Sequence, residues 1–209
     1  MRVLIASGGN PPSKHLLEIY AKDTIIAADR GVDYLLEADL VPSLVLGDFD
    51  SIDEKSLDFL KKEGVSLKQW PKEKDETDTH LALLEAIRMG ADEIHLVGAL
   101  GSRFDHTMAN VALLERMDAY QVPCEIIDDD NRIFFAKPGD YEIKKGDYSY
   151  LSVLPLDEKI RLSIYGCKYP LNRDDLYRNK SMGVSNEILQ DQGKITIYQG
   201  RALIVQSRD

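Results

Sequence analysis

Short apolar segments alternate with helical patterns along the first 130 or so residues. Strands are predicted at residues 3–6, 24–28, 44–46, 65–70, 94–97 and 125–127, and helices at residues 14–21, in a stretch through 34–36, and at 53–62, 78–89 and 104–120. The strands are apolar at consecutive positions, which is typical of strands buried on both faces. We therefore predict a parallel sheet with helices on both of its faces.

The two longest predicted helices each carry an apolar side, with residues spaced three apart. We expect these sides to face the sheet. The residues concerned are Leu81, Leu84 and Ile87 in the first helix, and Met108, Val111, Leu114 and Met117 in the second.

The pattern changes near residues 128–131, and no amphipathic helix is predicted beyond them. Strands are predicted at residues 133–135, 148–154, 160–164, 195–198 and 202–205, with turns at 138–140, 145–147 and 191–193 between them. We predict an α/β chain of two domains: a Rossmann-like, parallel-sheet domain at residues 1–130 and an all-β sandwich at residues 131–209.

Composition and charge exclude several classes of protein. The 209 residues are 44% hydrophobic, enough for a core and more than disordered chains carry. The net charge of −10 does not favour a nucleic-acid partner. No apolar run reaches the roughly 18–20 residues that span a bilayer, and no signal peptide is expected. Cys124 and Cys167 are expected to be buried, reduced thiols, which fits a cytoplasmic protein.

Glycines and acidic residues follow five of the predicted strands. The segments that carry them are residues 8–10, 29–31, 47–51, 74–78 and 98–106. The carboxyl ends of parallel strands lie at one edge of a sheet, where ligands bind. We therefore expect these segments to meet in one site.

Asp48 and Asp50 flank Phe49, so in an extended segment both carboxylates point the same way. Two like charges on one side repel each other unless a cation lies between them. Mg²⁺ is the natural candidate, because it is often held by one or two carboxylates together with substrate phosphates. The alternative is a solvated acidic turn.

Several residues near helix starts also have structural explanations. Asp29 is a candidate helix cap, and the helix dipole favours Asp78 without any function. Ser102 and Asp105 have the spacing of a capping box, with Asp in place of the usual Glu or Gln. A cap does not explain Arg103 or the glycines before it. A glycine-rich turn that opens a helix offers backbone N–H groups to a phosphate.

Common nucleotide and hydrolase motifs are absent from the sequence. It has no P-loop, no Gly-x-Gly-x-x-Gly fingerprint, no His-Glu-x-x-His helix and no Gly-x-Ser-x-Gly elbow. The residues alone thus indicate a Mg²⁺-nucleotide enzyme, or a nucleotide-binding module, without a P-loop. They do not identify a substrate.

Four segments resemble, in order, the motifs of the thiamine pyrophosphokinase family. Residues 28–33 resemble its first acidic motif, residues 47–51 its Gly-Asp-x-Asp-Ser signature, residues 75–78 its Asp-x-Thr-Asp motif and residues 101–106 its Gly-x-Arg-x-Asp-His motif. Residues 183–186 are similar to the Ser-Asn stretch of the family's C-terminal domain. The resemblance covers essentially the whole chain.

The resemblance implies an enzyme that transfers the pyrophosphoryl group of ATP to the hydroxyl of thiamine, giving thiamine diphosphate and AMP, with Mg²⁺. It also implies a homodimer with active sites between subunits, in which the β domain contributes to the thiamine pocket. Asp48, Asp50 and Asp78 would then be the catalytic and metal-binding carboxylates. The residues at the ATP site would be Asp29, Arg30, Thr77, Asp78, Arg103 and Asp105, and those near thiamine would be Ser185 and Asn186.

The sequence leaves open the roles of Asp78 and Lys74 and two alternative functions. Asp78 is a candidate for the group that accepts the hydroxyl proton. The family often has Gln where this chain has Lys74, so the role of Lys74 is unassigned. One alternative function is another Mg²⁺-dependent diphosphate or nucleotidyl transferase, which its products would distinguish. A second is a non-catalytic nucleotide or thiamine sensor, which would bind its ligand without turnover.

Overall fold

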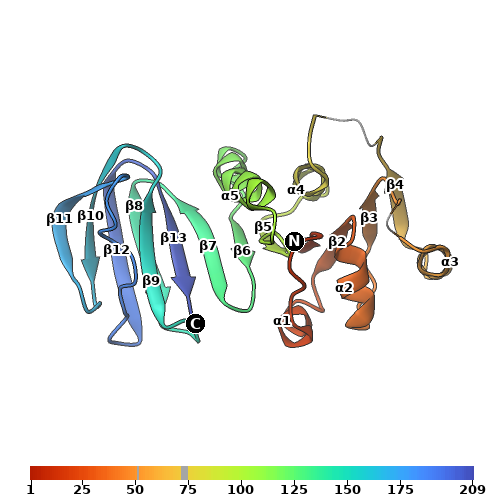
Figure 1. Ribbon diagram of the computed structural model, residues 1–209, viewed down its shortest axis with the longest axis horizontal. Helices are drawn as coiled ribbons and strands as arrows, with labels where there is room; N and C mark the ends of the chain where they lie inside the picture. The colour runs from red at the N-terminus through yellow and green to blue at the C-terminus, as the bar shows by residue number, and fades with distance from the viewer. Residues whose placement is uncertain (51, 72–74) are drawn as a thin grey trace. The chain divides into compact units, whose positions relative to one another are not determined.

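The computed structural model describes residues 1–50, 52–71 and 75–209. Lys74 lies outside the described residues, as does Ser51 at the end of the Gly-Asp-x-Asp-Ser segment. The fold is mixed α/β. The described residues form two compact units, Met1–Asp129 and Asp130–Asp209 (Figure 1).

A parallel sheet forms the centre of the first unit. In spatial order its strands are β4 (Ser66–Gln69), β3 (Leu44–Gly47), β2 (Thr24–Ala28), β1 (Arg2–Ala6), β5 (Glu93–Val97) and β6 (Cys124–Ile127). These neighbours all pair in parallel, as predicted. Strand order runs outward in both directions from β1. In such sheets, ligands bind beyond the carboxyl ends of the strands, at the point where the order reverses.

Helices cover both faces of this sheet. They are α1 (Lys14–Ile19), α2 (Gly31–Glu37), α3 (Glu54–Lys62), α4 (Asp78–Arg88) and α5 (Phe104–Ala119). Figure 1 shows α1 and α2 on one side of the strands and α4 and α5 on the other. On the α1 side, Leu4 and Val45 of the sheet share a buried core with Leu17, Leu35 and Leu60 of the first three helices.

The buried sides of α4 and α5 differ in part from the prediction. In α4 the buried residues are Thr79, Ala82, Leu83 and Ala86, whereas the predicted Leu81, Leu84 and Ile87 are only half-buried. Three of the four buried side chains are small, with Leu83 as the large one, and α4 contacts β1, β2 and β3. In α5, Leu114 and Met117 are buried as predicted and Val111 is half-buried, but Met108 is 50% exposed. Asn110 takes the buried position one turn before Leu114.

Antiparallel strands form the second unit. One group pairs in the order β7 (Asn131–Ala136), β13 (Ala202–Ser207) and β9 (Tyr150–Pro155). The other is a sheet in the order β11 (Leu171–Tyr177), β10 (Lys159–Tyr165), β12 (Gln192–Gln199) and β8 (Gly139–Lys144). Val153 and Ile204 of the first group share one buried core with Leu162 and Ile197 of the second.

The sequence prediction missed β8 and β11 and assigned a turn to residues 138–140, where β8 in fact begins. Both strands lie at the edges of their sheet. Each has most of its residues exposed or half-buried, so neither shows a clear apolar alternation.

The two cysteines match the sequence prediction. Cys124 and Cys167 are buried and form no disulfide, and burial raises the pKa of the Cys124 thiol to about 12. Among the described residues, no helix is both long and apolar enough to cross a membrane.

Candidate active site

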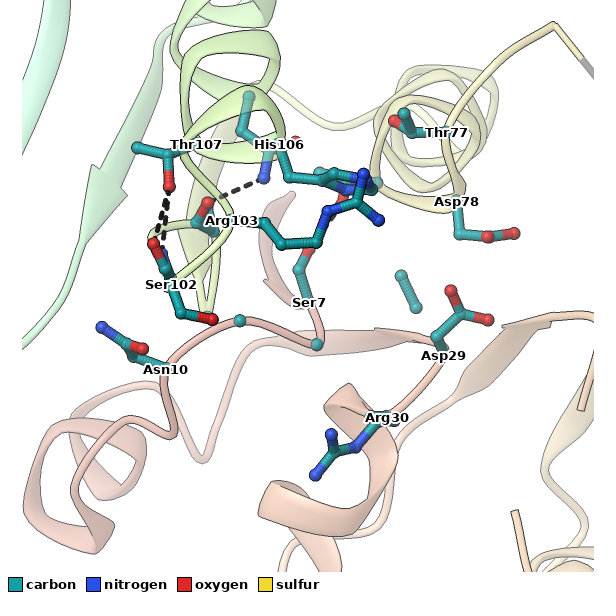
Figure 2. Close-up of a pocket in the computed structure, with 18 of the residues that line it drawn as sticks. Ser7, Asn10, Asp29, Arg30, Thr77, Asp78, Ser102, Arg103, His106 and Thr107 are labelled. Carbon is teal, nitrogen blue, oxygen red and sulfur yellow. Dashed lines mark hydrogen bonds between the residues drawn. The ribbon is translucent and has the colours of Figure 1, made fainter. Parts of the chain in front are cut away.

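A cavity of about 790 Å³ lies at the carboxyl ends of β1, β2, β3 and β5, where α4 and α5 begin (Figure 2). All five segments predicted to meet contribute to its lining, so their convergence is confirmed. Figure 2 shows Asp29 and Asp78 at one end of the cavity and Asn10 and Ser102 at the other. The acidic and basic residues of the lining are Asp29, Arg30, Asp48, Asp50, Glu76, Asp78, Arg103 and His106.

Asp48 and Asp50 reach the cavity through a turn, not through an extended segment. Phe49 between them has a φ of +64°, in the left-handed region, and the Asp50 N–H donates to Asp48 Oδ1 at 3.0 Å. The predicted extended geometry is therefore wrong. The turn nevertheless brings both residues to the lining of the same cavity.

Asp29 does not cap α2. The N-cap of α2 is Arg30, which makes no side-chain cap bond. Asp29 has a φ of +49°, and its carboxylate lies against the backbone of Gly47, where an added Cβ would be 2.4 Å from Asp29 Oδ1. Glycine at the end of β3 thus leaves the space that the Asp29 carboxylate occupies.

Thr77 and Asp78 lie at the start of α4. The Thr77 hydroxyl caps the helix by accepting a hydrogen bond from the His80 N–H at 3.2 Å. Asp78 is in the first turn, where the helix dipole favours a carboxylate. Both residues line the cavity, so α4 fixes the position of each.

Arg103 and Asp105 form an exposed ion pair at the start of α5, with 2.6 Å between Arg103 Nη2 and Asp105 Oδ2. The hydrogen bond from Arg103 holds the pKa of Asp105 below its usual range. Arg103 lines the cavity, whereas Asp105 does not. The predicted capping box, which begins at Ser102, is wrong, because the N-cap of α5 is Arg103, whose side chain makes no cap bond.

Polar groups between the charged residues were missed by sequence reasoning. Ser7, the buried residue that follows β1, accepts a hydrogen bond from Thr79 Oγ1 at 3.0 Å. Thr107 and Asn110 of α5 also line the cavity. A polar residue within the apolar side of a helix was the available signal for Asn110, which precedes the buried Leu114 and Met117.

Two loops form one wall of the cavity by pairing with each other. The Gly9 N–H donates to Gly98 O and the Asn10 N–H to Leu100 O, each at 2.7 Å. A Cβ on Gly9 would lie 2.4 Å from both of these carbonyl oxygens. Only glycine allows the loops to approach this closely.

Ser185 and Asn186, the residues assigned to thiamine by resemblance, lie in the second unit. Ser185 is exposed and its N–H donates to Ser152 Oγ at 3.0 Å. Asn186 is buried, and its amide exchanges hydrogen bonds of 2.9 and 2.8 Å with the backbone of Tyr169. The Asn186 side chain thus holds the loop that carries Ser185.

The donor set of the cavity suits a hard cation such as Mg²⁺, because Asp29, Asp48, Asp50, Glu76 and Asp78 all offer carboxylate oxygens. In the described part of the chain, no three metal-ligating side chains gather closely enough to hold an ion by themselves. Mg²⁺ characteristically completes its coordination with water and substrate phosphates. The residues therefore fit a metal that binds together with a phosphate-bearing substrate.

Comparison with known proteins places both units in one family. Residues 16–126 match the model of the thiamin pyrophosphokinase catalytic domain, and residues 140–202 match that of the thiamin pyrophosphokinase vitamin B1 binding domain. Thiamine pyrophosphokinase of Bacillus subtilis is 34% identical over 186 residues, which cover 88% of this chain and 87% of that protein.

Solved structures give the same result. The crystal structure of Bacillus subtilis thiamine pyrophosphokinase matches with a TM-score of 0.92 and 31% identity, with all of both chains covered. Thiamin pyrophosphokinase from Candida albicans shares the fold, with a TM-score of 0.82, 22% identity, and 100% of this chain and 90% of that chain covered.

The fold, the cavity and these matches define the chain as an enzyme of the transferase class. It belongs to the thiamine pyrophosphokinase family.

Proposed function

We propose that this enzyme transfers the pyrophosphoryl group of ATP to the hydroxyl of thiamine, releasing thiamine diphosphate and AMP, with Mg²⁺. The observation that carries the proposal is the acidic cavity at the strand ends of a chain that belongs to this family. In this proposal residues 1–130 are a Rossmann-like nucleotide-binding domain. Residues 131–209 are a sandwich that contributes to the thiamine site.

The charge of the cavity supports a metal-dependent reaction. Five carboxylates and two guanidinium groups line it, so the described lining is negative. A triphosphate is also strongly negative and would be repelled by this lining without added cations. Asp48, Asp50 and Asp78 are the proposed metal-binding residues. When bound, Mg²⁺ would neutralise charge on the phosphate oxygens.

The remaining lining residues are proposed to bind and orient ATP. Arg30 and Arg103 supply positive charge for the phosphates, and Asp29 and Thr77 line the same cavity. Asp105 fixes the Arg103 guanidinium through their ion pair. A carboxylate near the attacking hydroxyl accepts its proton, and Asp78 is the candidate. Transfer of this kind depends mainly on positioning and charge neutralisation.

Thiamine is proposed to contact the second unit near Ser185 and Asn186. This unit matches the vitamin B1 binding domain of the family. We propose a homodimer in which active sites lie between subunits, as the family resemblance implies. The two buried, unpaired cysteines support a reducing compartment, so we propose that the enzyme works in the cytoplasm.

A product assay tests the reaction. Purified protein is incubated with thiamine, ATP and Mg²⁺, with and without EDTA, and the products are separated by chromatography. We expect equal amounts of thiamine diphosphate and AMP, and neither when EDTA is present. Thiamine monophosphate with ADP would contradict pyrophosphoryl transfer, and full activity with EDTA would contradict the metal requirement.

Asp48→Asn and Asp50→Asn test the proposed metal site. Each removes a negative oxygen donor from the cavity, so turnover should fall by about a hundredfold to a thousandfold, the range seen when charge-stabilising groups are removed. Asp58→Asn is the matched control, because Asp58 lies on α3, is exposed and does not line the cavity. A folded Asp48→Asn variant that retains near-full activity would contradict the assignment.

A further inference from the structure

The loop between β5 and α5, residues 98–103, has no regular secondary structure, yet its peptide groups are bonded on two sides. Buried peptide groups outside helices and strands need other partners. On one side, the carbonyl oxygens of Gly98 and Leu100 accept the N–H groups of Gly9 and Asn10, each at 2.7 Å. These bonds tie the loop to the segment after β1.

The other side of the loop is bonded to side chains of α5. Asn110 Nδ2 donates to the Ala99 carbonyl oxygen at 2.7 Å. Thr107 Oγ1 accepts from the Gly101 N–H at 3.1 Å and lies 3.3 Å from the Gly101 carbonyl oxygen, to which its hydroxyl donates. Figure 2 shows the dashed lines from Thr107 to the loop. The two residues are three positions apart and share one side of the helix.

Successive carbonyl oxygens are thus bonded in alternation. The carbonyl oxygens of residues 98 and 100 accept hydrogen bonds from the segment after β1, and those of residues 99 and 101 accept hydrogen bonds from α5. Each of these oxygens carries partial negative charge and would repel a phosphate if it turned into the cavity. Because these carbonyl oxygens accept hydrogen bonds from the segment after β1 and from α5, they do not turn toward the cavity. The same loop leads directly to Arg103, which lines the cavity.

We propose that Thr107 and Asn110 are positioning residues for ATP: they clamp the loop at residues 98–103 so that its carbonyl oxygens stay away from the phosphates and Arg103 stays at the cavity. This inference rests on the proposed function, because it requires ATP in this cavity. Neither residue needs to touch the reacting atoms. Asn110 is buried, whereas Thr107 is half-buried at the cavity wall.

Thr107→Val is the decisive variant, because it keeps the size of the side chain and removes the hydroxyl. In the ligand-free protein, amide hydrogen exchange at Gly101 should become about tenfold faster or more, since its N–H loses its partner. In steady-state assays the KM for ATP should rise about tenfold, while the KM for thiamine stays within about twofold. Thr107→Ser retains the hydroxyl and should restore both measurements.

Ser56→Ala serves as the control. Ser56 is on α3 and does not line the cavity, and its hydroxyl donates to Asp53 Oδ2 at 2.7 Å. Removing this hydroxyl should leave both KM values unchanged. Asn110→Asp, which loses the donor to Ala99, should raise the KM for ATP further if thermal melting shows that it folds. Thr107→Val remains informative if Asn110→Asp does not fold.

The outcomes separate this inference from the function on which it rests. An active wild type, together with a Thr107→Val variant whose KM for ATP is unchanged, overturns the clamp alone. An equal rise in both KM values also overturns it, because a general structural defect would then explain the loss. A wild type that forms no AMP from ATP and thiamine overturns the proposed function and, with it, this role of the clamp.

Discussion

Phe49 and Asp29 hold left-handed backbone conformations beside the cavity, with φ values of +64° and +49°. Such conformations cost a non-glycine residue roughly 1–2 kcal/mol and persist where the surroundings fix them. Phe49 packs against the core of the first unit, and the Asp29 carboxylate lies over Gly47. These two backbone conformations bring Asp29, Asp48 and Asp50 to the lining of one cavity. The alternation of side chains along an extended strand does not predict either conformation.

Gln121 also has a left-handed backbone conformation, but it does not line the cavity. It follows the C-cap of α5, is exposed and has a φ of +59°. We expect Gln121→Gly to raise the free energy of unfolding by about 0.5–1 kcal/mol, because glycine adopts this conformation without a Cβ clash. Chemical denaturation would measure the change, with Gln121→Ala as a control that should bring no gain. A loss of stability in Gln121→Gly would contradict the prediction.

At the scale of elements, Glu85 of α4 joins its helix to the edge strand β4. Its carboxylate lies 2.5 Å from Lys68 Nζ of β4 and 2.5 Å from Arg88 Nη2 of the same helix. Its side chain is 11% exposed. The hydrogen bond from Arg88, and then that from Lys68, lower the pKa of Glu85 to about 2. This three-residue bridge holds α4, and hence Thr77 and Asp78 at its start, against the sheet.

This bridge predicts a pH dependence of stability. Because the folded-state pKa of Glu85 is below its ordinary value of 4.5, the bridge stabilises the fold fully above pH 4.5 and is lost as the pH falls toward 2. Glu85→Gln should cost about 1–2 kcal/mol at pH 7. The difference from wild type should shrink as the pH falls from 5 toward 2. Urea denaturation at several pH values measures it, and a difference that grew at low pH would contradict this account.

The elements were predictable from the sequence to different degrees. The helix predicted at residues 78–89 is confirmed as α4, Asp78–Arg88. It was predictable because its apolar pattern, its polar cap and the glycine after it are all local signals in the sequence. Its buried side was not predictable, because that side depends on which strands it packs against. The strands β8 and β11 were missed because an edge strand gains its structure from pairing with a neighbour, not from its own apolar pattern.

At the scale of the whole molecule, the proposed homodimer predicts that inactive variants complement each other. Asp48→Asn removes a proposed metal-binding carboxylate from the first unit. Ser185→Arg adds bulk and positive charge at the proposed thiamine site of the second unit, where it would repel the thiamine cation. If each active site combines units from two subunits, refolding the two variants together should restore about a quarter of wild-type activity, because half of the dimers are mixed and each has one intact site. Each variant alone is the control. No recovery in mixed dimers would indicate that each site lies within one subunit.

The sequence by itself determined the alternation of strands and helices in the first unit, the change to β structure near residue 130, and the segments that meet at the cavity. These features depend on local apolar patterns and on the rule that parallel strands end at one edge of a sheet. Only the tertiary structure decided the turn at Phe49, the position of Asp29 over Gly47 and the hydrogen bonds of Thr107 and Asn110 with the loop at residues 98–103. Each of these depends on a specific contact between a side chain and a neighbouring loop or strand, or on one residue's backbone conformation. Neither kind of feature leaves a periodic signal in the sequence.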